Sequence, residues 1–176
     1  EGFLKQTGGT VRVYSELGVG TTFKLFFPAV LDGAAVAEET ESRPLALAPG
    51  RRILLVEDEA DVLSALATML ERAGCVVVPA PSGDRALEIF EAASRFDLVV
   101  TDIVMPGVLQ GPALVRALRA IRPDMPAVFM SGYAAEATVH GNGLRARDIR
   151  LMKPVQRSAL LKAVARTLDT AAGASG

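Results

Sequence analysis

The sequence predicts an α/β fold in which five parallel strands form one doubly wound sheet, preceded by an N-terminal β-hairpin. Two observations carry this prediction. Short apolar runs rich in β-branched residues recur from residue 51 to residue 153, and segments with helical spacing of apolar residues separate them. Such alternation is typical of a parallel sheet covered by helices on both faces. A separate alternation of apolar and polar residues near the N-terminus indicates the hairpin.

The hairpin is predicted over residues 10 to 27. Apolar and polar residues alternate from Val11 to Tyr14 and again from Phe23 to Phe27, with glycines between the two runs. A lone two-stranded hairpin is only marginally stable in water. It therefore packs on the next domain, pairs with a second chain to form a homodimer, or is the remnant of a larger sheet. The helical appearance of the segment before it favours the remnant.

The main domain is predicted to begin near Arg51, after a linker over residues 31–50 that mixes Ala, Glu, Pro and Gly without a sustained period. Helices are expected from near Ala60, after Ser82 as the N-cap, from Pro112 and from near Ser158. A helix over residues 134–148 is expected to be short or mobile because two glycines disfavour it, and residues 171–176 are predicted as a disordered tail. The five strands are expected at RRILLVE (51–57), CVVVPA (75–80), FDLVVT (96–101), PAVFMS (126–131) and IRLMK (149–153).

Charge and composition argue against several classes of function. Nineteen basic and twenty acidic residues give a net charge of −1, so no broad positive field is available for nucleic acid or for an anionic membrane. The single cysteine, Cys75, cannot form an internal disulfide and is expected to be a buried structural thiol. No apolar run approaches the roughly 20 residues that span a bilayer, and no signal peptide is recognisable. We therefore expect a cytoplasmic protein without direct membrane contact.

Four of the predicted strands end in polar residues: the first in Glu57 and Asp58, the third in Asp102, the fourth in Ser131 and the fifth in Lys153. The carboxyl ends of parallel strands meet at one edge of the sheet, where ligands bind in open α/β folds. Three acids at short range require a cation, and oxygen ligands are those that Mg²⁺ prefers. The sequence thus predicts a Mg²⁺ site. There Asp102 could attack a phosphoryl group whose oxygens contact Lys153 and Ser131.

Each of these residues also has a plainer explanation. A strand-terminal aspartate such as Asp102 often forms a turn, and Glu57 and Asp58 could cap the helix that starts near Ala60. A serine or a lysine in such a place is commonly a turn or surface residue. The convergence of all of them at one edge favours a site.

Four motifs, ILLVEDE, DLVVTDIVMPG, FMSGY and LMKP, resemble those of a response-regulator receiver domain in order and approximate spacing, over residues 51–170. The resemblance implies a flavodoxin-like receiver fold, with Asp102 as the phosphoacceptor. It also implies that Glu57, Asp58, Asp102 and the backbone carbonyl of Val104 bind Mg²⁺. Ser131 and Lys153 would then contact the phosphoryl group, and the bond from Lys153 to the following proline would be cis.

The motifs depart from the usual receiver pattern: the acidic pair is Glu57-Asp58 where Asp-Asp is frequent, and Gly132 follows Ser131 where Ala is common. Arg150 and Leu151 stand where an aromatic switch residue is usual shortly before the lysine, which argues against an output through an aromatic rotamer. Val104 and Tyr133 occupy the positions that flank the path of the hydrolytic water in the family. An apolar and a bulky group there predict slow dephosphorylation.

Residues 1–30, through GFLKQTGGTVRVYSELGVGTTFKLFFP, resemble the C-terminal end of a histidine-kinase ATP-binding domain, with Thr21 or Thr22 near the nucleotide. Together the two resemblances imply the C-terminal part of a hybrid sensor histidine kinase. The boxes that bind adenine and Mg²⁺ in such kinases are absent, so we do not expect ATP-dependent kinase activity from this fragment. The implied partners are the kinase core in cis and a histidine phosphotransfer protein. The lone His140 is expected to be an ordinary surface residue.

Two other functions stay open. The first is a receiver-like scaffold that binds a kinase or a phosphotransfer protein without being phosphorylated. The complete set of acids, Asp102, Ser131 and Lys153 argues against it. The second is an aspartate-nucleophile phosphatase of another fold. Such enzymes typically have a second aspartate two positions after the nucleophile, where this chain has Val104.

Overall fold

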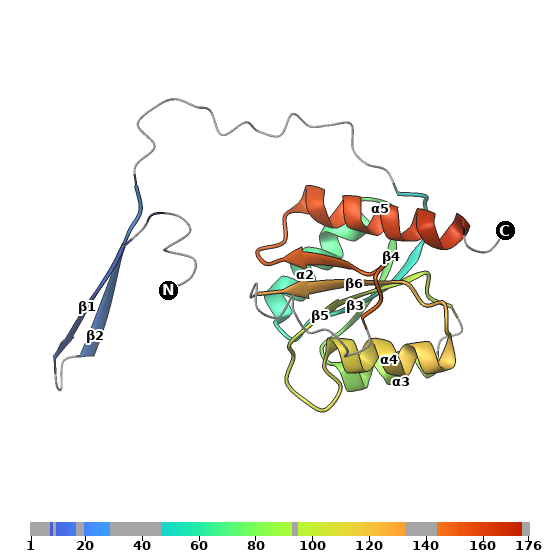
Figure 1. The fold of residues 1–176 in the computed structure, drawn as a ribbon, viewed down its shortest axis with the longest axis horizontal. Coiled ribbons are helices and arrows are strands. Elements are labelled where there is room, and N and C mark those ends of the chain that lie inside the picture. The colour runs from blue at the N-terminus through green and yellow to red at the C-terminus, as the bar shows by residue number, and fades with distance from the viewer. Residues whose placement is uncertain are drawn as a thin grey trace, which may run out of the picture. The chain divides into compact units, whose positions relative to one another are not determined.

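The computed structural model describes residues 8, 10–16, 20–28, 47–92, 95–132 and 144–173, and the chain divides into two compact units, Glu1–Ser42 and Arg43–Gly176 (Figure 1). In the first unit, β1 (Thr10–Glu16) pairs antiparallel with β2 (Gly20–Phe26). The predicted hairpin is thereby confirmed. Val11 lies opposite Leu25 and Val13 opposite Phe23, so these four side chains share one exposed face of the hairpin.

The second unit contains one sheet whose five strands are all parallel, as predicted, in the order β4-β3-β5-β6-β7. Strand order reverses between β3 and β5, which is where ligands bind in doubly wound sheets. In chain order the elements are β3 (Arg52–Val56), α2 (Ala60–Glu71), β4 (Val76–Ala80), α3 (Gly83–Ala92), β5 (Leu98–Asp102), α4 (Gly111–Ile121), β6 (Ala127–Ser131), β7 (Ile149–Met152) and α5 (Arg157–Gly173).

Helices cover both faces of the sheet, α2 and α5 one face and α3 and α4 the other (Figure 1). The alternating strand residues divide the core accordingly, since successive side chains point to opposite faces. Leu55 and Val100 pack with Leu70 and Leu160 on the first face, while Val56 and Val99 pack on the second. The central strands β5 and β6 are buried along their whole length, which explains why their sequences read as continuous apolar runs.

Local signals account for the ends of the helices. Ser82 caps α3 as predicted, since its Oγ accepts a hydrogen bond of 3.2 Å from the Arg85 backbone N–H. Pro112 lies in the first turn of α4, where its missing N–H costs nothing.

The prediction of a disordered tail from residue 171 is wrong at its start, because α5 continues to Gly173. The alanines at 171 and 172 favour helix, and the glycine that follows is a poor helix former. Most of the helix predicted over 134–148 lies outside the described residues.

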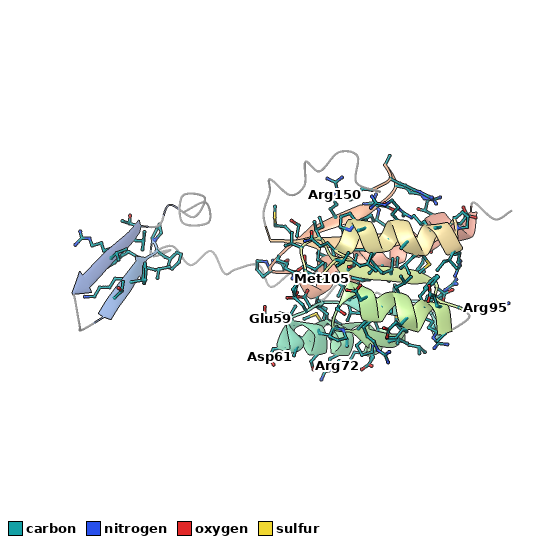
Figure 2. All side chains as sticks on the ribbon, turned by 90° about the horizontal axis from the view of Figure 1, so that it is seen from below. Glu59, Asp61, Arg72, Arg95, Met105 and Arg150 are labelled. Atoms are coloured by element: carbon teal, nitrogen blue, oxygen red, sulfur yellow. The ribbon has the colours of Figure 1, made fainter. Side chains whose placement is uncertain are left out.

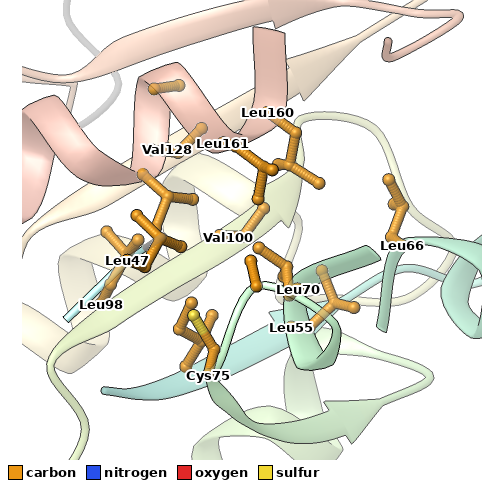
Figure 3. Close-up of a cluster of buried hydrophobic side chains, with 14 of the residues drawn as sticks. Leu47, Leu55, Leu66, Leu70, Cys75, Leu98, Val100, Val128, Leu160 and Leu161 are labelled. Atoms are coloured by element: carbon orange, nitrogen blue, oxygen red, sulfur yellow. The ribbon is translucent and has the colours of Figure 1, made fainter. Parts of the chain in front are cut away.

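Leu47 belongs to the segment predicted as linker, yet only 6% of its surface is exposed, and it packs beside Leu98 in the core under α5 (Figure 3). The Gly50 N–H also donates a 3.0 Å hydrogen bond to the Gly74 carbonyl. Packing of the second unit therefore begins upstream of Arg51. Cys75 is buried in the same cluster, as predicted, and its burial, together with the charge of Asp97, raises the pKa of its thiol.

Candidate functional site

Three carboxylates meet at the carboxyl ends of β3 and β5. Asp102 is the last residue of β5, and Glu57 directly follows β3, whose Val56 pairs with Thr101. The two carboxylates thus end neighbouring strands at the same level. Oxygen atoms of Glu57, Asp58 and Asp102 all lie within 4.8 Å of one another, with Glu57 and Asp102 buried and Asp58 exposed. This confirms the predicted convergence of the acids.

Lys153 brings a positive charge into this group from the end of β7. Its Nζ donates hydrogen bonds to Glu57 Oε2 at 2.7 Å and to Asp102 Oδ2 at 2.5 Å. The Lys153 N–H donates to the Ser131 carbonyl at 2.7 Å, and the bond to Pro154 is cis, as predicted. The ammonium therefore bridges two buried carboxylates that would otherwise repel each other.

The contacts of Lys153 with the two carboxylates shift the pKa values of the groups involved. Burial raises the pKa of the Glu57 carboxyl above its ordinary 4.5, and the hydrogen bond and charge of Lys153 oppose that rise only in part. For Lys153, burial alone would lower the pKa, but the hydrogen bonds to Asp102 and Glu57 and their charges outweigh it, so the pKa is raised above 10.5. Lys153 is accordingly cationic throughout the neutral range.

Capping by the acidic pair is not what the structure shows. The N-cap of α2 is Glu59, which makes no side-chain capping hydrogen bond, while the Glu57 carboxylate accepts hydrogen bonds from Lys153 and from the backbone of Glu59. Figure 2 shows Glu59 and Asp61 at the same end of the unit as Met105, which lies in the loop after β5.

The remaining predicted residues lie around this group. Ser131 ends β6 and is buried, next to Met152 in the register of β6 and β7. Val104 is half exposed, and its backbone N–H donates a 3.4 Å hydrogen bond to Asp102 Oδ1. Metal ligation by its carbonyl stays a prediction. Arg150 is exposed on β7 and Leu151 packs against the core. Tyr133 and His140 lie outside the described residues.

Two glycines that the sequence analysis did not single out hold the loop after Asp102 in place. A Cβ added to Gly111 would lie 2.0 Å from the Asp102 carbonyl oxygen, and one added to Gly83 would lie 1.8 Å from the Leu109 carbonyl oxygen. No side chain fits at such distances, so α3 and α4 can approach the loop only through glycine. Gly107, which follows Met105-Pro106, has φ +106°, a backbone conformation that glycine adopts without strain.

The donor set fits a hard divalent cation. Within the described ranges, Glu57, Asp58 and Asp102 form a cluster of carboxylates that can each offer one oxygen to a shared ion. Oxygen ligands, of which only a few come from the protein, are what Mg²⁺ selects. A metal here would lie next to Asp102, which contacts Lys153 and ends β5, the central strand of the sheet.

Comparison with known proteins is consistent with this geometry. The family described as response regulator receiver domain matches residues 53–165. The sensor kinase CckA of Brucella abortus (strain 2308) is 39% identical over 176 residues, an alignment that covers 96% of this chain. The same alignment covers 18% of CckA, so this chain spans about a fifth of the length of that relative.

Solved structures show the same fold. A response regulator receiver protein from Sinorhizobium medicae WSM419 superposes with a TM-score of 0.64 at 35% identity, covering 69% of this chain and 97% of that one. The receiver domain of the hybrid histidine kinase CckA superposes with a TM-score of 0.55 at 36% identity, covering 66% of this chain and 98% of that domain. In the part of the chain that the structure describes, no helix is long and apolar enough to cross a membrane.

Proposed function

This chain belongs to the family of response regulator receiver domains of two-component systems, and on that premise we propose that Asp102 is its phosphoacceptor. The observation that carries the proposal is the contact of the Lys153 ammonium with both Asp102 and Glu57, at 2.5 and 2.7 Å. This contact gathers a nucleophile, an acidic metal ligand and a cation at one strand edge. A carboxylate in that setting can accept a phosphoryl group from a phosphohistidine.

The transfer is a substitution at phosphorus. A carboxylate oxygen of Asp102 forms a bond to the phosphorus atom while the bond from phosphorus to the imidazole nitrogen breaks. The electron pair of that bond returns to the imidazole, so the donor leaves as a neutral histidine once it is protonated. β5 holds Asp102 rigidly for this step because the strand is buried along its whole length.

The neighbouring side chains stabilise the charge on the transferred group. Lys153 is cationic and already within hydrogen-bond distance of Asp102 Oδ2, so it can bind a phosphoryl oxygen there. The Ser131 hydroxyl is the proposed second donor. Glu57, Asp58, Asp102 and the carbonyl of Val104 would hold Mg²⁺, which when bound neutralises the phosphoryl oxygens. Val104 and Tyr133 would restrict the approach of water and slow hydrolysis of the phosphoaspartate.

We further propose that the chain is the C-terminal part of a hybrid sensor histidine kinase. The receiver family matches from residue 53, whereas the alignment with the sensor kinase CckA covers 96% of the chain and so extends into the hairpin unit. In this proposal residues 1–30 end an ATP-binding domain, residues 31–50 form the linker and residues 51–170 the receiver. The partners would be the kinase core in cis and a histidine phosphotransfer protein, and the compartment the cytoplasm.

Intact-mass spectrometry tests the phosphoacceptor. The chain is incubated with Mg²⁺ and acetyl phosphate beside Asp102→Asn and beside Asp169→Asn, which removes an exposed acid on α5. We expect a phosphoryl-sized gain in mass that requires Mg²⁺, is absent in Asp102→Asn and is retained in Asp169→Asn. If the gain is absent and Mg²⁺ with beryllofluoride also leaves the thermal stability unchanged, the chain is the unphosphorylated scaffold.

The exposed apolar face of the hairpin supports a separate proposal, a homodimer formed through residues 10–27. Light scattering on the full chain measures its mass directly. The same measurement is made on the double variant Val13→Thr/Phe23→Thr, which makes that face of the hairpin polar without changing the strand pattern. A mass of one chain for the unmodified protein at high concentration contradicts the dimer.

A further inference from the structure

A second charged region lies at the amino-terminal ends of the strands. Arg51 and Arg52 stand at the start of β3, Arg95 precedes β5, and Arg122 is the C-cap residue of α4. These four residues are called the arginine cluster below. Figure 2 shows Arg95 at the end of the unit opposite Glu59 and Met105. From Asp97 to Asp102 the chain advances five residues, which is about 16 Å along a strand. The cluster is therefore separate from the carboxylate site.

Two of these arginines line a pocket. Arg95 and Arg122 line a solvent-open pocket of about 360 Å³ together with Phe96 and Asp97. A cavity of that volume is at the lower end of the range for small-molecule sites. The phenyl ring of Phe96 is itself buried, so guanidinium and carboxylate groups dominate the surface that a ligand would meet.

The cluster is held in place by contacts with residues 96 and 97. Arg122 Nη1 donates a hydrogen bond to the Phe96 carbonyl, and the Arg52 guanidinium lies 5.1 Å from the centre of the Phe96 ring. That ring in turn stacks on Phe90 with a centroid distance of 5.8 Å. Arg51 Nη1 donates to Asp97 Oδ1 at 3.3 Å. Of the two guanidinium groups that line the pocket, that of Arg122 is thus held in place before any ligand arrives, which lowers the entropic cost of binding.

Basic residues outnumber acidic ones in the lining of the pocket, where Arg95 and Arg122 are basic and Asp97 is acidic. Both oxygens of the Asp97 carboxylate are engaged, Oδ1 by Arg51 and Oδ2 by the Arg52 backbone N–H at 2.7 Å. Among the described residues, Arg52, Arg95 and Arg122 take part in none of the ion pairs. The guanidinium charges of Arg95 and Arg122 are therefore not neutralised by a direct ion pair.

We propose that the pocket between Arg95 and Arg122 binds the phosphate groups of a small anionic ligand, with a diphosphate as the matching unit. Guanidinium groups bind phosphate oxygens through two parallel hydrogen bonds, and two of them on one pocket can hold adjacent phosphates. Because the Phe96 ring is covered by Arg52 and Phe90, it offers no free face for a nucleobase. Recognition is accordingly through the phosphates alone.

The test uses the full chain with pyrophosphate as the probe, in EDTA so that the carboxylate site holds no metal. We expect saturable shifts of the backbone amide signals of residues 95–97 and 122 in ¹⁵N NMR spectra, with no comparable shifts at Asp102 and Lys153. At tenfold excess over the dissociation constant the melting temperature should rise by about 5 °C. Sodium chloride at equal ionic strength should give neither effect.

Arg95→Gln with Arg122→Gln removes both lining charges and should weaken pyrophosphate binding by at least about tenfold. The matched control, Arg116→Gln, removes an exposed arginine of α4 that is outside the cluster and should bind as the unmodified chain does. The proposal would be overturned by NMR shifts that do not saturate or that sodium chloride reproduces. It would also be overturned if Arg116→Gln weakened pyrophosphate binding as much as the double variant does. Because both substituted side chains are exposed, a loss of folding is not expected, and circular dichroism verifies this.

Discussion

Replacing Lys153 by methionine tests how far the ammonium stabilises the strand-edge carboxylates. The substitution keeps most of the aliphatic volume and removes the donor that contacts Glu57 and Asp102. The Glu57 side chain is 1% exposed and the Lys153 side chain 24%. Removing one partner of a fully buried ion pair costs about 3–5 kcal/mol. Because Lys153 is partly hydrated, the lower end of that range, about 3 kcal/mol, is expected.

For a unit of this size the melting temperature should fall by about 12 °C in EDTA. Mg²⁺ should restore more stability to the variant than to the unmodified chain, because the metal would replace the missing positive charge between the carboxylates. Melting followed by circular dichroism with and without Mg²⁺ measures both effects. Lys162→Met, an exposed lysine on α5, is the matched control. A fall no larger than that of the control would refute the argument.

The same comparison has a predicted pH dependence. The pKa of Lys153 is raised in the folded chain above its ordinary 10.5. A raised pKa means that the folded state binds the proton more tightly, so the stabilisation is complete below pH 10.5 and is lost as the pH rises through the folded value. The difference in the free energy of unfolding between the unmodified chain and Lys153→Met should therefore stay constant from neutral pH to about pH 10.5. It should shrink only as the pH rises further, through the pKa of Lys153 in the folded chain.

Three further predictions concern the surroundings of the site and the core. Gly111→Ala places a Cβ 2.0 Å from a backbone carbonyl oxygen and should lower both the melting temperature and the rate of phosphorylation. Gly132→Ala, whose Cβ would meet none of the described residues within 4 Å, should leave stability within about 0.5 kcal/mol. Asp148→Asn breaks the buried pair with Arg119, whose Nη2 lies 2.5 Å from the carboxylate, and should cost about 3 kcal/mol in urea unfolding. Cys75 is buried with a raised pKa, so iodoacetamide should label it at neutral pH only at the rate of unfolding, and fast labelling of the folded chain would contradict this.

The fold was largely predictable because its strands are buried on both faces. A strand such as β5, with all five residues buried, must be apolar throughout, and the acid that ends it marks the strand boundary. Ser82 was recognisable as a cap from its place before the helical pattern, and the structure shows that hydrogen bond. The convergence of Glu57, Asp102 and Lys153 followed from parallel topology alone, since carboxyl ends of neighbouring strands share an edge.

Other features depend on contacts that a single sequence does not encode locally. Leu47 lies within the segment predicted as linker, and only its packing beside Leu98 makes it part of the core. The requirement for glycine at positions 83 and 111 comes from carbonyl groups of a loop that approaches from elsewhere in the chain. The bidentate contact of Arg119 with Asp148 joins residues 29 positions apart, and neither has a spacing that signals it.

Because the carboxylates and Lys153 lie at strand ends, the residues that form the site differ from the residues that form the outer surface of the helices. The carboxylates and Lys153 are fixed by the backbone of the sheet, whereas the outward faces of α2, α3, α4 and α5 contribute nothing to that geometry and carry mostly exposed side chains. Substitutions on those faces can therefore alter which protein docks without disturbing the carboxylate cluster and Lys153. One strand edge with these groups can in this way serve many signalling routes while the helices diverge to keep the routes separate.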